Sequence, residues 1–172
     1  CKTGIEVETF VHGALCMSVS GQCGLSAMIG SRSANRGRCA QACRLPFSAK
    51  GDKNSCALSL KDLCLVPYVA ELAEDGVASL KIEGRCKRPE YVAAAVTALV
   101  QARAGEAPDL DTLRAVFSRS GFTDGYYTGK RQQMFGTRQK DDVLQGQKVL
   151  PQLAQLYQKP TPQVPLDMHV TV

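Results

Sequence analysis

The sequence predicts an α/β fold that carries a long cysteine-rich loop. Three observations predict it: an alternating apolar stretch near the start, an order of helix, strand, loop and helix between residues 67 and 105, and four cysteines spread through a Gly- and Ser-rich stretch. The 172 residues are 44% hydrophobic and 22% charged, which is typical of a globular chain with a core rather than a disordered one.

A strand is predicted over residues 5–15, where apolar and β-branched residues alternate with mostly polar ones. Cys16 lies at its end. Residues 18–37 follow as a weakly periodic loop with room for a short helix around residues 25–29. Long loops of this kind are usually functional or disordered, and the cysteines within it favour function.

Helix and strand signals then alternate. Pro67 suits the first turn of a helix that ends at Gly76, and residues 77–82 are typical of a buried strand. Pro89 begins a strong helix that Gly105 stops. This order is typical of α/β proteins.

The remaining third is predicted less regularly. Asp109 is expected to cap a helix that runs through Phe117, and residues 122–140 are expected to form loops. A weaker helix from Asp142 is expected to be interrupted at Gly146 and Pro151. We therefore divide the chain into residues 1–141, a helix and Pro-rich linker over 142–165, and the start of a following domain at 166–172. Because the first residue is not Met, we expect an internal segment of a longer protein.

The charge pattern gives a first hint about ligands. The net charge is +5, and residues 32–53 hold six basic side chains against one acid. Such a stretch attracts phosphate or carboxylate, although a solvated loop surface would look the same. No apolar run reaches the roughly 20 residues that span a bilayer, and no signal peptide is visible, so we expect a cytoplasmic protein without a membrane partner.

Four of the eight cysteines form the most informative pattern, Cys16-x6-Cys23-x15-Cys39-x3-Cys43. Four thiolates could hold a [4Fe–4S] cluster or a zinc ion. Zinc sites usually contain two pairs of cysteines two to four residues apart, and only the second pair fits here. The spacing therefore favours a cluster, with buried or reactive thiols as the open alternative.

The other cysteines carry weaker signals. Cys64 lies in an apolar run and is predicted to be in the core. Cys56 is close enough to the loop to replace Cys43 as the fourth ligand. Cys86 has no assigned role, and Cys1 is expected to be untethered.

Several ordered blocks resemble the collagenase-like peptidase family, the thirty-second family of peptidases with unassigned catalytic type. The blocks are ETFVHGALC at 8–16, SGQCGLS at 20–26, RSANRGRCAQACR at 32–44, SLKDLC at 59–64, SLKIEGR at 79–85, GFTDGYY at 121–127 and MFGTRQ at 134–139. The resemblance extends to about residue 142.

The resemblance implies both a fold and a chemistry. It implies the later part of a TIM-type barrel, incomplete in this chain, with a helical extension. It implies a [4Fe–4S] cluster on four cysteines and oxygen-independent hydroxylation of tRNA, rRNA or the ubiquinone ring, linked in some relatives to prephenate. The family name instead implies proteolysis of a peptide substrate.

The residues give little support for a peptidase. The sequence has no Gly-x-Ser-x-Gly elbow and no His-Glu-x-x-His zinc motif. A thiol pair of His12 with Cys16 is the one arrangement that would serve proteolysis. A non-catalytic scaffold that associates with itself through an exposed sheet edge is a third class.

A hydroxylase reading assigns roles to charged residues instead. Glu8 and His12 are candidate proton carriers if they share one face of the first strand, and Lys81 and Glu83 lie where a parallel barrel would present catalytic groups. The alternative for Lys81 and Glu83 is a structural ion-pair network, and the alternative for Glu8 and His12 is a satisfied position in the core. The arginines that could clamp a carboxylate or phosphate are Arg32, Arg36, Arg38, Arg44 and Arg85.

Overall fold

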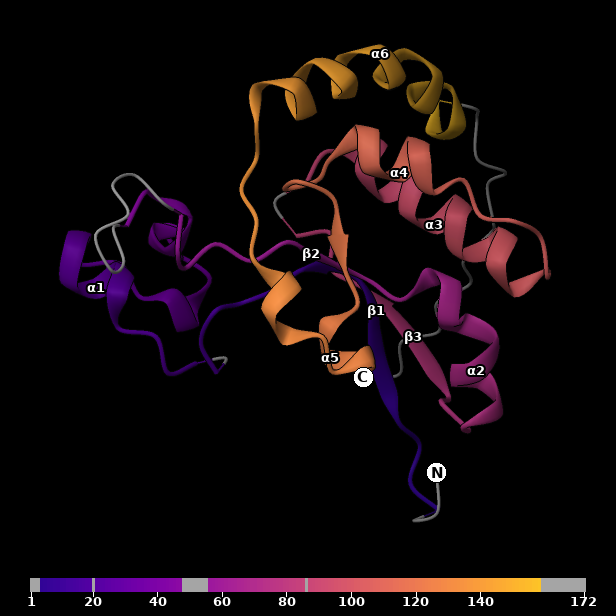
Figure 1. The fold of residues 1–172 in the computed structure, drawn as a ribbon, viewed down its shortest axis with the longest axis horizontal. Coiled ribbons are helices and arrows are strands. Elements are labelled where there is room, and N and C mark those ends of the chain that lie inside the picture. Colours follow the sequence, from indigo (N-terminus) through magenta and orange to yellow (C-terminus); the bar gives the residue numbers. More distant parts are fainter. Residues whose placement is uncertain (1–3, 20, 48–55, 86, 159–172) are drawn as a thin grey trace, which may run out of the picture.

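A four-stranded mixed sheet lies at the centre of the fold in the computed structural model, which describes residues 4–19, 21–47, 56–85 and 87–158. The strands β1 (Glu8–Ala14), β2 (Asp62–Cys64), β3 (Ser79–Ile82) and β4 (Phe122–Thr123) lie in the order β3-β1-β2-β4 (Figure 1). β1 pairs parallel with β3 and antiparallel with β2, and β2 pairs parallel with β4. The α/β class is confirmed. A TIM-type barrel is not shown by these strands and stays a prediction.

In Figure 1, most of the helices lie against the sheet, and one short helix, residues 25–30, lies apart from it. The α-helices are α1 (Leu25–Gly30), α2 (Val69–Glu74), α3 (Pro89–Arg103), α4 (Leu110–Val116), α5 (Gly125–Thr128) and α6 (Lys140–Tyr157). Short 3₁₀ turns are η1 (Ala34–Arg36), η2 (Ala42–Arg44), η3 (Val66–Tyr68) and η4 (Arg131–Met134). In Figure 1, α3, α4 and α6 stack as one layer.

Most predicted elements are confirmed, and the differences have local causes. The Asp109 carboxylate caps α4 by accepting a hydrogen bond from the backbone N–H of Thr112 at 2.9 Å. α6, however, runs without a break through Pro151. Its Gly146 is buried where an added Cβ would lie 3.2 Å from the carbonyl oxygen of Ala115, so glycine allows α6 to approach α4 closely. The expected interruption at Gly146 is therefore wrong.

The core has two parts. The larger cluster joins β2 to α3, α4 and α6 through residues such as Tyr91, Leu113 and Leu153. Cys64 belongs to it, as predicted, and burial raises the pKa of its thiol to about 11. The smaller cluster, which contains Val11 and Leu72, packs β1 against α2. These clusters hold the ends of the strands in place, and the candidate site residues lie near those ends.

The cysteine-rich segment, residues 15–47, leaves the end of β1 and folds as a separate group of turns around α1 (Figure 1). It has little regular structure, so its position depends on side-chain contacts with the sheet. Cys1, Cys86, the basic residues at 50 and 53, most of the Pro-rich linker and the predicted domain start at 166–172 lie outside the described residues. Among the helices that the structure does describe, none is long and apolar enough to cross a membrane.

Candidate functional site

The four predicted ligand cysteines surround one cavity of about 610 Å³. Cys16 follows β1, Cys23 precedes α1, Cys39 precedes η2 and Cys43 lies within η2, so three stretches of chain deliver them. Cys56 does not line this cavity, whereas the four ligands of the sequence prediction do. All six cysteines of the described residues are free thiols.

Local geometry directs polar hydrogens at one of these sulfur atoms. The backbone N–H of Gln41 lies 3.3 Å from the Cys39 sulfur, and the buried Ser26 hydroxyl lies 3.9 Å from it. Gln41 reaches this position with a left-handed backbone, φ 54°. Hydrogen bonds of this kind stabilise a thiolate, which is the form that binds a metal.

Burial and neighbouring groups shift the pKa of one thiol in the cavity. Burial raises the pKa of the Cys43 thiol, the neighbouring Arg44 guanidinium lowers it, and Cys39 and Cys16 raise it further. The thiols therefore lie close enough to influence one another. Yet no three His, Cys, Asp or Glu side chains in the described part of the chain converge tightly enough to hold a single metal ion.

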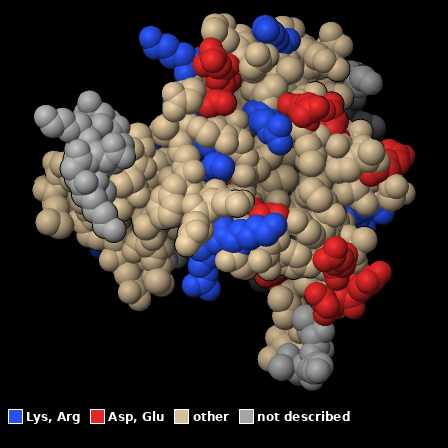
Figure 2. Space-filling model, viewed as in Figure 1, with Lys and Arg blue, Asp and Glu red and all other residues tan. Residues whose placement is uncertain are grey.

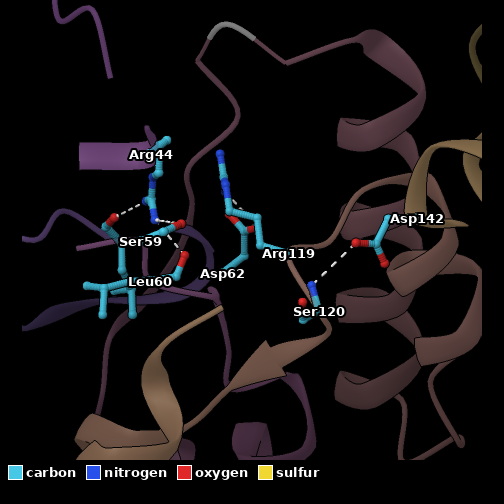
Figure 3. Close-up of polar contacts among 8 residues, drawn as sticks. Arg44, Ser59, Leu60, Asp62, Arg119, Ser120 and Asp142 are labelled. Atoms are coloured by element: carbon cyan, nitrogen blue, oxygen red, sulfur yellow. Dashed lines mark hydrogen bonds and ion pairs between the residues drawn. The ribbon is translucent and has the colours of Figure 1, made fainter. Parts of the chain in front are cut away.

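Arg44 connects this segment to the sheet. Its guanidinium donates to the carbonyl oxygens of Leu15 and Leu60, each at 2.6 Å, and to the Ser59 hydroxyl at 3.3 Å (Figure 3). Three hydrogen bonds to groups from two different segments make it a structural clamp. Among the described residues, none of the other four predicted substrate arginines donates as many side-chain hydrogen bonds as Arg44.

The other predicted arginines are more exposed. Arg85 lines the cavity and donates to the carbonyl oxygen of Gly37 at 3.0 Å. Gly37 has φ 76°, and an added Cβ would collide with the Arg85 guanidinium, so glycine allows this close approach. Arg32, Arg36 and Arg38 are exposed on the segment's surface.

The predicted catalytic residues do not gather in one place. Glu8 and Lys81 form an exposed ion pair of 2.8 Å between β1 and β3. The Glu83 carboxylate accepts from the backbone N–H of Arg85 at 2.7 Å. His12 is fully buried farther along β1, beyond a register shift that begins at Phe10, so it does not share an exposed face with Glu8.

His12 lies in an aromatic pocket. Its ring stacks on Tyr91 at a centroid distance of 5.3 Å and meets the edge of Phe122 at 5.2 Å. Burial lowers the pKa of His12 to about 4, although Asp62 opposes the shift. Both ring nitrogens and the Tyr91 hydroxyl are buried without a hydrogen-bond partner in the part of the chain that the structure describes. None of its recorded ring contacts involves Cys16, so the structure does not support the thiol pair.

A second group of charged side chains lies beside His12, and the sequence reasoning missed it. We call it the basic centre: Arg44, Lys87, Arg119 and Arg138 around the fully buried Asp62. Asp62 accepts two hydrogen bonds from one nitrogen of Arg119, at 2.6 and 2.8 Å. Figure 3 shows Arg119 on Asp62 and, near them, Arg44 directed at Ser59 and Leu60, and Figure 2 shows basic side chains in the middle of this face of the molecule.

The loop that carries Arg119 is held at both sides. The N–H of Ser120 donates to the Asp142 carboxylate at 3.4 Å (Figure 3), and its hydroxyl donates to the carbonyl oxygen of Thr137 at 2.7 Å. Asp142 also accepts from the N–H of Gln139 at 2.8 Å, which completes a capping box at the start of α6. The loop between α4 and β4, which carries Arg119, is therefore anchored to the start of α6 and to the loop before it.

Comparison with known proteins shows which protein family the chain matches. The profile of Peptidase family U32 matches residues 1–135. A collagenase of Porphyromonas gingivalis is 38% identical over 74% of this chain and 39% of its own length. A 23S rRNA 5-hydroxycytidine synthase of Escherichia coli is 46% identical over 52% of this chain and 15% of its own.

A third relative resembles the chain over a similar share of its length. The tRNA hydroxylation protein P of Helicobacter pylori is 34% identical over 71% of this chain and 34% of its own length. The chain thus spans less than half the length of each of these relatives. No solved structure matches it significantly.

Proposed function

Because the chain belongs to Peptidase family U32, whose members include RNA-hydroxylating proteins, we propose that it is part of an iron–sulfur-dependent, oxygen-independent RNA hydroxylase. The observation that carries the proposal is the convergence of Cys16, Cys23, Cys39 and Cys43 on one cavity. RNA as the substrate rests on the names of the relatives, which act on tRNA or 23S rRNA.

The four cysteines fit a [4Fe–4S] cluster. A cluster takes one thiolate at each iron, and four cysteines line the one cavity. The cavity volume of about 610 Å³ leaves room for such a group. When bound, it would supply one-electron redox chemistry.

The chain's own residues would prepare this site. Ser26 and Gln41 direct their hydrogens at the Cys39 sulfur, which stabilises the thiolate form. Leu25 and Leu58 form apolar parts of the cavity wall. Arg44 holds the carbonyl oxygen of Leu15 and so fixes the chain just before Cys16.

The first experiment is anaerobic purification with measurement of iron, sulfide and zinc per chain and of the visible spectrum. We expect iron and sulfide near four per chain, lost in Cys16→Ala, Cys23→Ala, Cys39→Ala and Cys43→Ala. Cys56→Ala is the matched control and should keep the cluster. Zinc alone, or iron that survives in the cavity variants, would contradict the cluster.

The second experiment tests the substrate. RNA from cells that make the wild-type protein or the Cys23→Ala variant would be digested and analysed for hydroxylated pyrimidine nucleosides by mass spectrometry. We expect the hydroxylated nucleoside to depend on Cys23 and not on Cys56. Equal levels in wild type and variant would remove RNA hydroxylation as the function of this site.

Proteolysis is the alternative that the collagenase relative favours. It predicts hydrolysis of gelatin or collagen peptides by purified protein without iron. A rate that is unchanged by His12→Ala and by Cys16→Ala would show that neither residue serves it. Prephenate and self-association stay predictions.

A further inference from the structure

The basic centre has more positive charge than its one carboxylate can balance. Asp62 is bound by Arg119, and neither Lys87 nor Arg138 forms an ion pair with a carboxylate among the described residues. The Arg44 guanidinium donates hydrogen bonds to two carbonyl oxygens and a hydroxyl, which are uncharged acceptors. Four cations therefore share one anion.

The cations are held close together by an aromatic ring. The Lys87 ammonium lies 3.1 Å from the centroid of the Phe117 ring, and the guanidinium carbons of Arg138 and Arg119 lie 4.5 and 4.8 Å from it. Cation–π attraction offsets part of the repulsion between like charges. It does not supply the hydrogen-bond acceptors that an ammonium and a guanidinium need.

The pKa of Lys87 reflects this excess of positive charge. Burial lowers the pKa of its ammonium to about 8, Arg119, Arg138 and Arg44 lower it as well, and Asp62 opposes them. A half-buried lysine in a positive field gains most from an added anion. The Tyr91 ring centroid lies 5.0 Å from the ammonium, and the buried Tyr91 hydroxyl has no hydrogen-bond partner among the described residues.

The sequence position of these residues also indicates a binding site. Lys87 comes from the loop before α3, Phe117 and Arg119 from the junction of α4 and β4, and Arg138 from the loop before α6. Residues that are far apart along the chain meet at one point, on loops that the sheet and its helices hold in place. Binding sites are commonly built this way.

We propose that the basic centre binds a doubly charged oxyanion group, a phosphate monoester or a dicarboxylate, through Lys87 and Arg138, with Arg119 and Asp62 as its buried support. The ammonium and the guanidinium would donate to the anion's oxygens as charge-assisted hydrogen bonds. The test of this site does not depend on the cluster proposal, because the anion would be bound by Lys87 and Arg138 and the measurement needs no iron.

The test is isothermal titration calorimetry on the iron-free chain with inorganic phosphate, malonate and acetate. We expect at least one of the two dianions to bind at millimolar concentrations and acetate to bind much more weakly. The dianion that binds identifies the source: phosphate indicates a phosphate monoester, and malonate indicates a dicarboxylate. Heat from neither dianion would overturn the proposal.

Variants locate the binding. Lys87→Met keeps the aliphatic contact with Phe117 and removes the charge, and Arg138→Gln removes an exposed cation; each should weaken binding about tenfold. Arg103→Gln, at the opposite end of α3 from Lys87, is the matched control and should bind like the wild type. Circular dichroism establishes that the variants are folded. Dianion binding that persists undiminished in both Lys87→Met and Arg138→Gln would also overturn the proposal.

Discussion

The buried, neutral state of His12 predicts a specific loss of stability in mild acid. The side chain is fully buried, and its pKa falls from an ordinary value of 6.5 to about 4. Burial is the main cause, Lys87 adds a small repulsion, and Asp62 and the backbone of Leu63 favour the proton. Asp62 and the Leu63 backbone offset only part of the cost of burying a charge, because the pKa stays well below its ordinary value.

The sign follows from proton linkage. Between about pH 6.5 and 4, the unfolded chain binds the His12 proton and the folded chain does not, so the free energy of unfolding falls as the pH falls through this window. A difference of about 2.5 pKa units corresponds to about 3 kcal/mol. That is a large share of the roughly 5–15 kcal/mol by which small domains are stable.

The assay is urea unfolding of the wild type and of His12→Phe, followed by circular dichroism between pH 7 and pH 4. Phenylalanine keeps an aromatic ring against Tyr91 and Phe122 and has no proton to bind. Carboxylates titrate in both proteins, so the informative quantity is the difference between them. We expect the wild type to lose about 3 kcal/mol more than the variant. Parallel curves, or a His12 NMR titration near pH 6.5, would refute the reasoning.

Three further predictions concern the framework. Asp62→Asn leaves the buried Arg119 without its counter-charge and should lower the free energy of unfolding by about 3–5 kcal/mol in urea titrations; a smaller loss in Asp62→Asn combined with Arg119→Met would support that cause. Arg44→Gln should release the cysteine-rich segment, seen as faster limited proteolysis there while the helical layer stays protected. Gly13→Ala should cost more than about 2 kcal/mol, because its Cβ would meet backbone atoms beyond β3, while Gly24→Ala, in open space, should cost much less.

The sequence predicted the elements whose signals are local. α3 begins at Pro89, and α4 is capped by Asp109, because proline at the first turn and aspartate at the N-cap act through their own backbone neighbours. β2 and β4 were missed because strands of three and two residues are too short to show an alternating pattern. The antiparallel pairing of β1 with β2 depends on tertiary packing and has no local signature.

The candidate sites divide in the same way. The cysteines were found because their spacing is itself the signal, and the cavity places all four together. Lys87, Arg119 and Arg138 look like ordinary surface charges in the sequence, and only the fold brings them to Phe117. Asp62 did carry a usable signal, since an acid within the apolar run of residues 60–66 must find a buried partner.

Arg44 links the two sites physically. One of its nitrogens holds the carbonyl oxygen of Leu15, just before Cys16, and the other holds that of Leu60, two residues before Asp62. Burial and Arg119 lower the pKa of Arg44, while Cys43 and Asp62 oppose the shift. Groups from both sites therefore act on the Arg44 guanidinium. If an anion at the basic centre changes how Arg44 is held, it would change the affinity of the cysteine cavity for the proposed cluster, and the cluster would change the anion's affinity by the same factor. Measuring dianion binding with and without the cluster would therefore give the coupling from either direction.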